Sequence, residues 1–179
     1  SFTEEVVASK ESSKSITLSR SSFSKAQRIQ EISSVSYKRI DTCNGELNRI
    51  LGGGMVPGSV ILIGGEPGIG KSTLALQIAL KMDELVTLYV SGEESEQQIK
   101  LRADRIGYEF DHCLVLSETN LENIIAQIDQ EKPGLVIIDS VQTLASDMLE
   151  SSAGSVSQIK ECASQLLKYA KRTATPVIL

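Results

Sequence analysis

The sequence contains the stretch Gly65-Glu66-Pro67-Gly68-Ile69-Gly70-Lys71-Ser72, which matches the G-x-x-x-x-G-K-S pattern of a phosphate-binding P-loop. A short apolar run precedes it at residues 59–64, and residues 73–80 follow it with helical character. A strand, a glycine-rich loop and a helix in this order form the context that a P-loop requires. The alternative is a glycine turn that merely joins a strand to a helix, and the flanking segments argue against it.

The residue types of this stretch suit the phosphates of a nucleotide. Its glycines let the backbone turn tightly and point N–H groups at phosphate oxygens, and the helix that follows directs its positive end at the same anion. Lys71 is expected to reach the β- and γ-phosphates, and the Ser72 hydroxyl is expected to ligate Mg²⁺. We therefore predict ATP or ADP with Mg²⁺ as ligands, bound by Gly65, Glu66, Pro67, Gly68, Ile69, Gly70, Lys71, Ser72 and Thr73.

Length and composition fit one folded domain. Of the 179 residues, 41% are hydrophobic, which is ample for a buried core. No apolar run approaches the ~20 residues of a membrane-spanning helix, and the first residues lack the features of a secretory signal. We therefore expect no membrane partner and a cytoplasmic location. The net charge of -5 gives no overall attraction to nucleic acid, although a local basic patch can still provide it.

The order of predicted elements indicates an α/β fold. Residues 1–36 are rich in serine and are interpreted as a flexible linker or arm, in which residues 24–32 form either a short helix against a partner or part of a solvated tail. Residues 37–179 form the predicted core, a mostly parallel sheet flanked by helices. Strands are predicted at 59–64, 86–90, 113–116, 135–139 and 176–179, and helices at 46–51, 73–80, 96–106, 121–131 and 156–171. Because the chain stops inside an apolar strand, we expect a core that is incomplete at its carboxyl end.

Carboxylates follow two of the predicted strands. Glu93 and Glu94 come just after residues 86–90, at the sheet edge where ligands of parallel sheets bind. One of them could activate the water that attacks the γ-phosphate, or both could simply begin the next helix. Asp139 ends the apolar run 135–139 and resembles a Walker B aspartate, which holds the Mg²⁺ complex beside a P-loop.

The loop at residues 140–154, two arginines and the cysteines are given structural interpretations or left open. Residues 140–154 form a polar, mobile loop at the same edge, which could contact a substrate or serve as an ordinary connection. Arg102 and Arg105 are interpreted as solvated charges of the helix at 96–106. The three cysteines are far apart and form no C-x-x-C pair, so no zinc site is expected in this chain.

The sequence resembles the RecA-like ATPases of bacterial DNA repair over residues 37–179. The resemblance lies in five segments: LGGG at 51–54, GEPGIGKST at 65–73, YVSGEESEQQIKLR at 89–102, DSVQT at 139–143 and GSVSQIKEC at 154–162. It implies a P-loop core in which Glu93, rather than its neighbour Glu94, polarises the attacking water. Cys43 stands where the family usually has glycine, and Asn48 where many members have aspartate.

The same resemblance implies a biological role. It places a DNA-contacting loop at residues 146–157, inside a homo-hexameric ring that hydrolyses ATP in a DNA-dependent manner. The implied activity is a helicase-like motor that promotes branch migration of recombination intermediates, on single-stranded and branched DNA, alongside RecA. The family's four-cysteine zinc module and its carboxyl-terminal Lon-like domain have no counterpart in these 179 residues.

Three other classes of function remain as alternatives, of which the plainest is a purely structural binding module. A RecA-like signalling ATPase similar to the clock protein KaiC also carries paired glutamates after the second core strand, and stimulation of hydrolysis by DNA would separate it from a motor. A small-molecule kinase is disfavoured, because the sequence shows no acceptor-binding lid with arginines.

Overall fold

The computed structural model describes residues 26–33, 37–108 and 111–179. The chain divides into two units, with the boundary between Val35 and Ser36. In the described part of the first unit, residues 29–31 form a single 3-10 turn, η1 (Ile29–Glu31), and contribute no buried side chain. Residues 24 and 25 of the possible helix at 24–32 lie outside the described residues. The interpretation of residues 1–36 as a linker stays a prediction.

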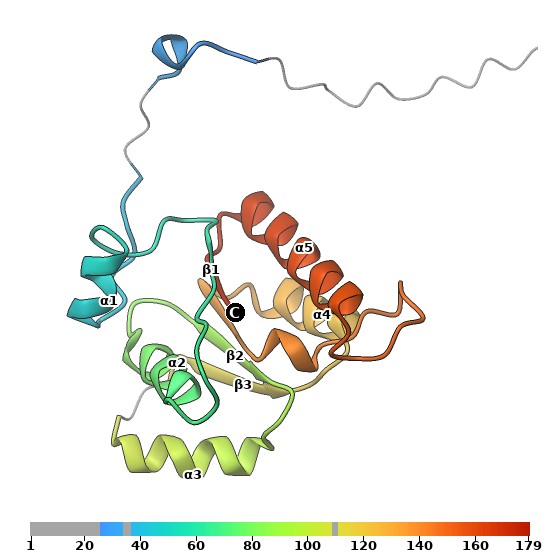
Figure 1. Ribbon diagram of the computed structural model, residues 1–179. Helices are drawn as coiled ribbons and strands as arrows, with labels where there is room; N and C mark the ends of the chain where they lie inside the picture. Colours follow the sequence, from blue (N-terminus) through green and yellow to red (C-terminus); the bar gives the residue numbers. More distant parts are fainter. Residues whose placement is uncertain (1–25, 34–36, 109–110) are drawn as a thin grey trace, which may run out of the picture. The chain divides into compact units, whose positions relative to one another are not determined.

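The second unit contains a sheet of five strands that pair in parallel throughout, in the order β1-β5-β4-β2-β3 (Figure 1). The strands are β1 (Val60–Ile61), β2 (Thr87–Ser91), β3 (Cys113–Ser117), β4 (Leu135–Asp139) and β5 (Val177–Ile178). Every residue of β2 is buried, as are the first four of β4. Continuous apolar runs of this kind are typical of strands covered on both faces.

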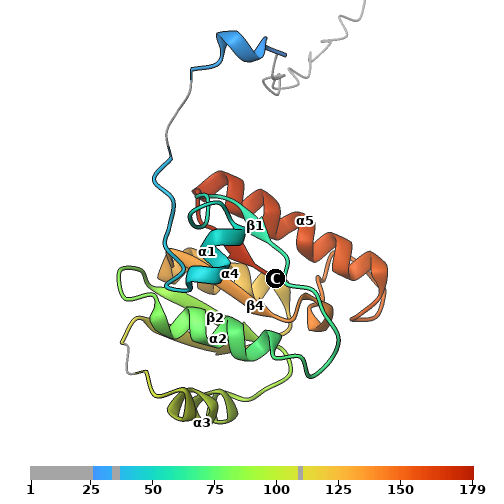
Figure 2. The same cartoon turned by 60° about the vertical axis from the view of Figure 1, so that its left-hand side comes forward.

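Helices cover both faces of this sheet. They are α1 (Gly45–Ile50), α2 (Lys71–Lys81), α3 (Glu96–Ile106), α4 (Leu121–Glu131) and α5 (Val156–Thr173), with a 3-10 turn, η2 (Val141–Thr143), after β4. Side chains of α2 and α3 form one core cluster with Tyr89 and Ile137, whereas α4 and α5 pack on the opposite face with Leu88 and Val136. Figure 2 shows these two helical layers on either side of the strands. The predicted α/β, RecA-like P-loop fold is confirmed.

The segment before the P-loop is held by polar contacts around Asn48. The Asn48 side chain accepts hydrogen bonds from the N–H and the hydroxyl of Thr42, at 3.0 and 2.8 Å, and donates to Asp41 at 2.6 Å. Cys43 has a φ of 53°, in the left-handed region that favours glycine. A glycine at position 43 would adopt this conformation without the steric cost that a side chain brings.

Helix length and polarity bear on the membrane question. Among the described residues, no helix is both long and apolar enough to cross a membrane.

Candidate functional site

The amino end of α2 differs from the other α-helix starts in the described residues. Side chains of Asn44, Ser95, Asn120 and Ser155 cap α1, α3, α4 and α5 by accepting backbone N–H groups. The N-cap of α2 is Gly70, which has no capping side chain. Its first-turn N–H groups are therefore left for an anion, which the helix dipole also favours.

Lys71 bends back over the predicted phosphate-binding loop. Its ammonium group donates to the carbonyls of Gly65 at 2.8 Å and Glu66 at 2.9 Å. The loop itself, residues 65–70, is exposed, and the side chain of Ile69 is 70% exposed. The structure thus gathers the predicted residues 65–73 into one open cradle with a positive charge at its rim.

The P-loop meets the end of β4 through one hydrogen bond. The Ser72 hydroxyl donates to Oδ1 of Asp139 at 2.9 Å, although the two residues are 67 positions apart. The predicted pair of Mg²⁺-binding side chains is therefore in direct contact. The peptide bond between Asp139 and Ser140 is cis.

The other oxygen of Asp139 has partners that the sequence analysis missed. The Tyr89 hydroxyl donates to Asp139 Oδ2 at 2.6 Å, and Arg102 Nη2 lies 3.0 Å from the Tyr89 hydroxyl and 3.9 Å from that same Oδ2. Burial, followed by the hydrogen bond to Asp139, raises the pKa of Tyr89, so the phenol keeps its proton as a donor. The interpretation of Arg102 as a solvated charge is wrong, because its side chain is only 22% exposed.

Signals for both missed residues were available. Arg102 lies three residues after Ile99 and four before Ile106, so helical spacing puts it on the apolar face of α3. Tyr89 lies opposite Ile137 in the parallel register of β2 and β4, and Asp139 is two residues further on, hence on the same face of the sheet.

The two glutamates after β2 have different surroundings. Glu94 Oε2 lies 2.8 Å from Arg102 Nη2 in a half-buried ion pair. Glu93 is exposed, and in the described residues its side chain makes no hydrogen bond or ion pair. The backbone N–H groups of both residues lie within 3.3 Å of the Ser91 hydroxyl, which fixes the turn that carries them.

Close packing holds this turn against the chain after β4. A Cβ atom on Gly92 would lie 2.0 Å from Oγ1 of Thr143 in η2. Only glycine fits there without a shift. The segment with the two glutamates and the segment after Asp139 therefore form one packed edge.

The loop after η2 is anchored by two buried or half-buried side chains. Gln158, which is 1% exposed, accepts from the Ser146 N–H at 2.9 Å and donates to the carbonyls of Ser146, Leu149 and Ser151 at 2.9–3.2 Å. Glu122 accepts from the Ser146 hydroxyl at 2.6 Å. The predicted mobile loop thus has a fixed base, while Met148 at its tip is 72% exposed.

The donor set fits a nucleotide with Mg²⁺. A hydroxyl and a carboxylate in contact supply the oxygen ligands that Mg²⁺ prefers, and the remaining ligands usually come from phosphates and water. The open N–H groups and Lys71 suit phosphate. In the described residues there is no group of three or more His, Cys, Asp or Glu side chains that could hold a metal ion. Phosphate and water oxygens would therefore have to complete the coordination of Mg²⁺.

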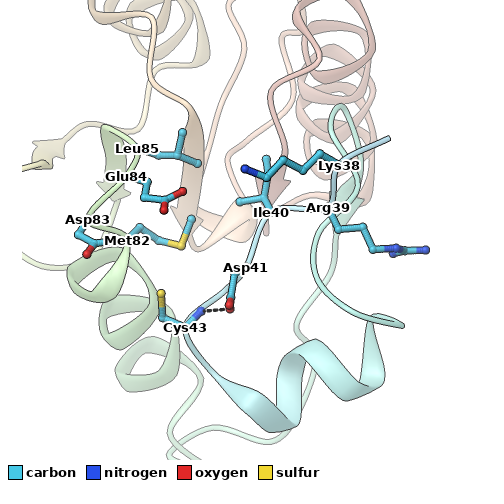
Figure 3. Close-up of a pocket in the computed structure, with 9 residues that line it drawn as sticks. All are labelled: Lys38, Arg39, Ile40, Asp41, Cys43, Met82, Asp83, Glu84 and Leu85. Atoms are coloured by element: carbon cyan, nitrogen blue, oxygen red, sulfur yellow. Dashed lines mark hydrogen bonds between the residues drawn. The ribbon is translucent and has the colours of Figure 1, made fainter. Parts of the chain in front are cut away.

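A separate cavity of about 450 Å³ lies between the segment at residues 38–43, which precedes α1, and the turn after α2 (Figure 3). Its lining residues are Lys38, Arg39, Ile40, Asp41, Cys43, Met82, Asp83, Glu84 and Leu85. Because residues 82–85 precede β2, the cavity lies toward the amino edge of the sheet. Ligands of parallel α/β sheets bind at the carboxyl edge, so this cavity is not the candidate nucleotide site.

Fold and site together define the chain as the core of a P-loop ATPase of the RecA-like class. Comparison with known proteins agrees: the profile of a family described as an AAA domain matches residues 26–179, and the chain belongs to this family. It is 46% identical over 170 residues to the DNA repair protein RadA of Halalkalibacterium halodurans, covering 94% of this chain and 37% of that protein.

Other relatives carry the same name. The DNA repair protein RadA of Listeria monocytogenes is 50% identical over 161 residues, which cover 86% of this chain and 35% of that protein. For the DNA repair protein RadA of Bacillus subtilis, the identity is 46% over 157 residues, or 87% of this chain and 34% of the relative. The chain thus spans about a third of the length of these curated relatives, and the predicted resemblance is confirmed.

Proposed function

We propose that the chain is the ATP-binding and ATP-hydrolysing core of a DNA-repair motor that acts on recombination intermediates. The observation that carries the proposal is the hydrogen bond between Ser72 and Asp139, beside the uncapped start of α2. It joins a phosphate cradle to a carboxylate, which is the arrangement that phosphoryl transfer needs. The relatives are named as DNA repair proteins, which supports the choice of DNA as substrate.

Each residue of the site has a distinct proposed role. The first-turn N–H groups of α2 and the Lys71 ammonium hold the phosphates, and Lys71 exchanges its two loop carbonyls for phosphate oxygens when ATP binds. Mg²⁺, when bound, neutralises the charge that develops on the phosphates, and Ser72 and Asp139 would hold it. Glu93 orients and polarises the attacking water, since its exposed carboxylate is unpaired in the described residues.

Contact with DNA is proposed for the loop at residues 146–157. This loop leaves the carboxyl edge of the sheet and is held at its base by Gln158. It contains Asp147 and Glu150 but no lysine or arginine. Contact there would therefore use backbone N–H groups and serine hydroxyls, and would depend weakly on salt compared with binding by basic side chains.

The complete protein is proposed to work as a homo-hexamer, alongside RecA, in the cytoplasm. In this arrangement ATP lies between neighbouring subunits, and the loops at 146–157 line the channel for DNA. Residues 1–36 are proposed to be the linker that leads into the core. Branch migration and helicase-like movement on single-stranded and branched DNA belong to this proposal.

The test is ATP hydrolysis by the complete protein, with and without single-stranded and branched DNA. We expect DNA to stimulate turnover and Glu93→Gln to reduce it by about 100-fold or more while ATP still binds. Stimulation that is absent at saturating DNA would refute the motor and favour a signalling ATPase. Normal turnover in Glu93→Gln would refute the role of Glu93.

A further inference from the structure

Arg102 is placed on α3 so that one nitrogen meets three groups of the candidate site. Its Nη2 lies 2.8 Å from Glu94 Oε2, 3.0 Å from the Tyr89 hydroxyl and 3.9 Å from Asp139 Oδ2. Its Nε is buried and has no hydrogen-bond partner in the described residues. Buried donors are nearly always paired. The guanidinium of Arg102 is therefore oriented for the contacts of Nη2, and Nε is left without a hydrogen bond.

The two oxygens of Asp139 are assigned to different partners. Oδ1 accepts from Ser72 of the P-loop, and Oδ2 accepts from Tyr89. A carboxylate held at one oxygen alone can rotate, because its terminal torsion has a broad minimum. The contacts of Tyr89 and Arg102 with Oδ2 therefore fix the direction in which Oδ1 points.

We propose that Tyr89 and Arg102 are positioning residues that aim Asp139 Oδ1 at Ser72 for the binding of a divalent cation. Through the same guanidinium, Arg102 keeps Glu94 paired and leaves Glu93 as the carboxylate that faces water. The inference rests on the proposed function for the identity of the cation and the nucleotide. The arrangement matches the general behaviour of groups that orient metal ligands, whose loss lowers metal affinity or activity by about 10- to 100-fold.

The test measures the affinity of the complete protein for ADP over a series of Mg²⁺ concentrations and in EDTA. Tyr89→Phe keeps the buried ring and removes only the hydroxyl, and Arg102→Ala removes the guanidinium. In both variants we expect about a tenfold rise in the Mg²⁺ concentration that gives half of the maximal effect, with unchanged ADP affinity in EDTA. Arg102→Lys should fall between Arg102→Ala and wild type, because it keeps the charge without the planar fork.

The control is Arg105→Ala, which removes an exposed arginine from the same helix and should leave the Mg²⁺ dependence at the wild-type value. Wild-type Mg²⁺ dependence in both Tyr89→Phe and Arg102→Ala would overturn the proposal. An equal loss of ADP affinity in EDTA would also overturn it, since the variants would then damage the P-loop in general.

A second measurement separates this inference from the proposed function. If wild-type protein bound no nucleotide, the proposed function would fail, and urea unfolding without ligand would decide whether Arg102 and Glu94 act together. Each single change breaks the ion pair between Arg102 and Glu94 and should lower the urea midpoint. We expect the midpoint of the double variant Arg102→Ala/Glu94→Gln to fall by less than the sum of these two decreases, because the pair can be lost only once. Additive midpoints would overturn the pairing.

Discussion

The P-loop and the carboxylate edge of β2 and β4 form the two halves of the candidate site, and they are encoded in different ways. The P-loop is a continuous stretch at residues 65–72, exposed over residues 65–70, whose backbone N–H groups are proposed to hold the phosphates. The carboxylate edge is assembled from Tyr89, Glu94, Arg102 and Asp139, which are up to 50 positions apart and half-buried or buried. The P-loop can be predicted from local sequence, whereas the carboxylate edge depends on strand register and on which face of a helix each side chain occupies.

The largest expected effect is on the P-loop side. Lys71→Ala removes the ammonium group that is proposed to bind the phosphates, and we expect ATP turnover of the complete protein to fall about 1,000-fold, equivalent to about 4 kcal/mol. Steady-state phosphate release measures this. Lys168→Ala, which removes an exposed lysine of α5, should retain wild-type turnover. A fall of less than tenfold in Lys71→Ala would show that the local motif does not dominate the site.

The next effect tests the packing of the carboxylate edge. Gly92→Ala places a Cβ atom 2.0 Å from Thr143 Oγ1, and overpacking of this kind costs about 2–3 kcal/mol. Urea unfolding measures the loss. Adding Thr143→Gly removes the nearest atoms and should recover part of the stability. If the double variant is no more stable than Gly92→Ala, then η2 does not constrain the turn.

Gly70 of the P-loop is expected to affect stability through its backbone conformation rather than through packing. Gly70 has a φ of 101°, but a Cβ atom there would have no neighbour within 4 Å. Gly70→Ala should therefore cost only backbone strain, about 1–2 kcal/mol in unfolding free energy. Gly45→Ala, at an open helical position without positive φ, should be neutral or stabilising. Rescue of Gly70→Ala by a change in a neighbouring side chain would contradict this account.

The smallest effect concerns the helix that carries Arg102. The side chains of Ser95 and Gln98 form a capping box at the start of α3. Ser95→Ala should lower the unfolding free energy by about 1 kcal/mol. Ser95→Gly should lower it by only about 0.3 kcal/mol. Chemical denaturation of the two variants side by side measures the difference. Wild-type stability of Ser95→Ala would show that the cap does not stabilise α3.

Much of the fold was predictable because its signals are local. Continuous apolar runs predicted the central strands. Helical spacing predicted α3 and α4 with the bounds found in the structure. The edge strand β1 was harder, since it spans only residues 60–61 of the predicted run 59–64, although Ser59 and Ile63 also form backbone hydrogen bonds with Val177 and Leu179.

The site was predictable in part for the same reason. The P-loop and Asp139 follow sequence patterns, whereas the orientation of Arg102 depends on how α3 packs beside β2. The separation of Glu93 from Glu94 likewise depends on which of them meets Arg102. Position and residue type leave the two glutamates equivalent, because their difference arises from tertiary contacts, and only the family resemblance pointed to Glu93.

The hydrogen bond between Tyr89 and Asp139 also gives the protein an optical signal of its own. The sequence has four tyrosines and no tryptophan, so its ultraviolet fluorescence comes from tyrosine. A phenol that donates to a carboxylate emits weakly, because its excited state passes the proton to the acceptor. Any rearrangement of Asp139 when a ligand arrives will therefore change the emission of Tyr89. We therefore expect the tyrosine emission of the unlabelled protein to report on the candidate nucleotide site.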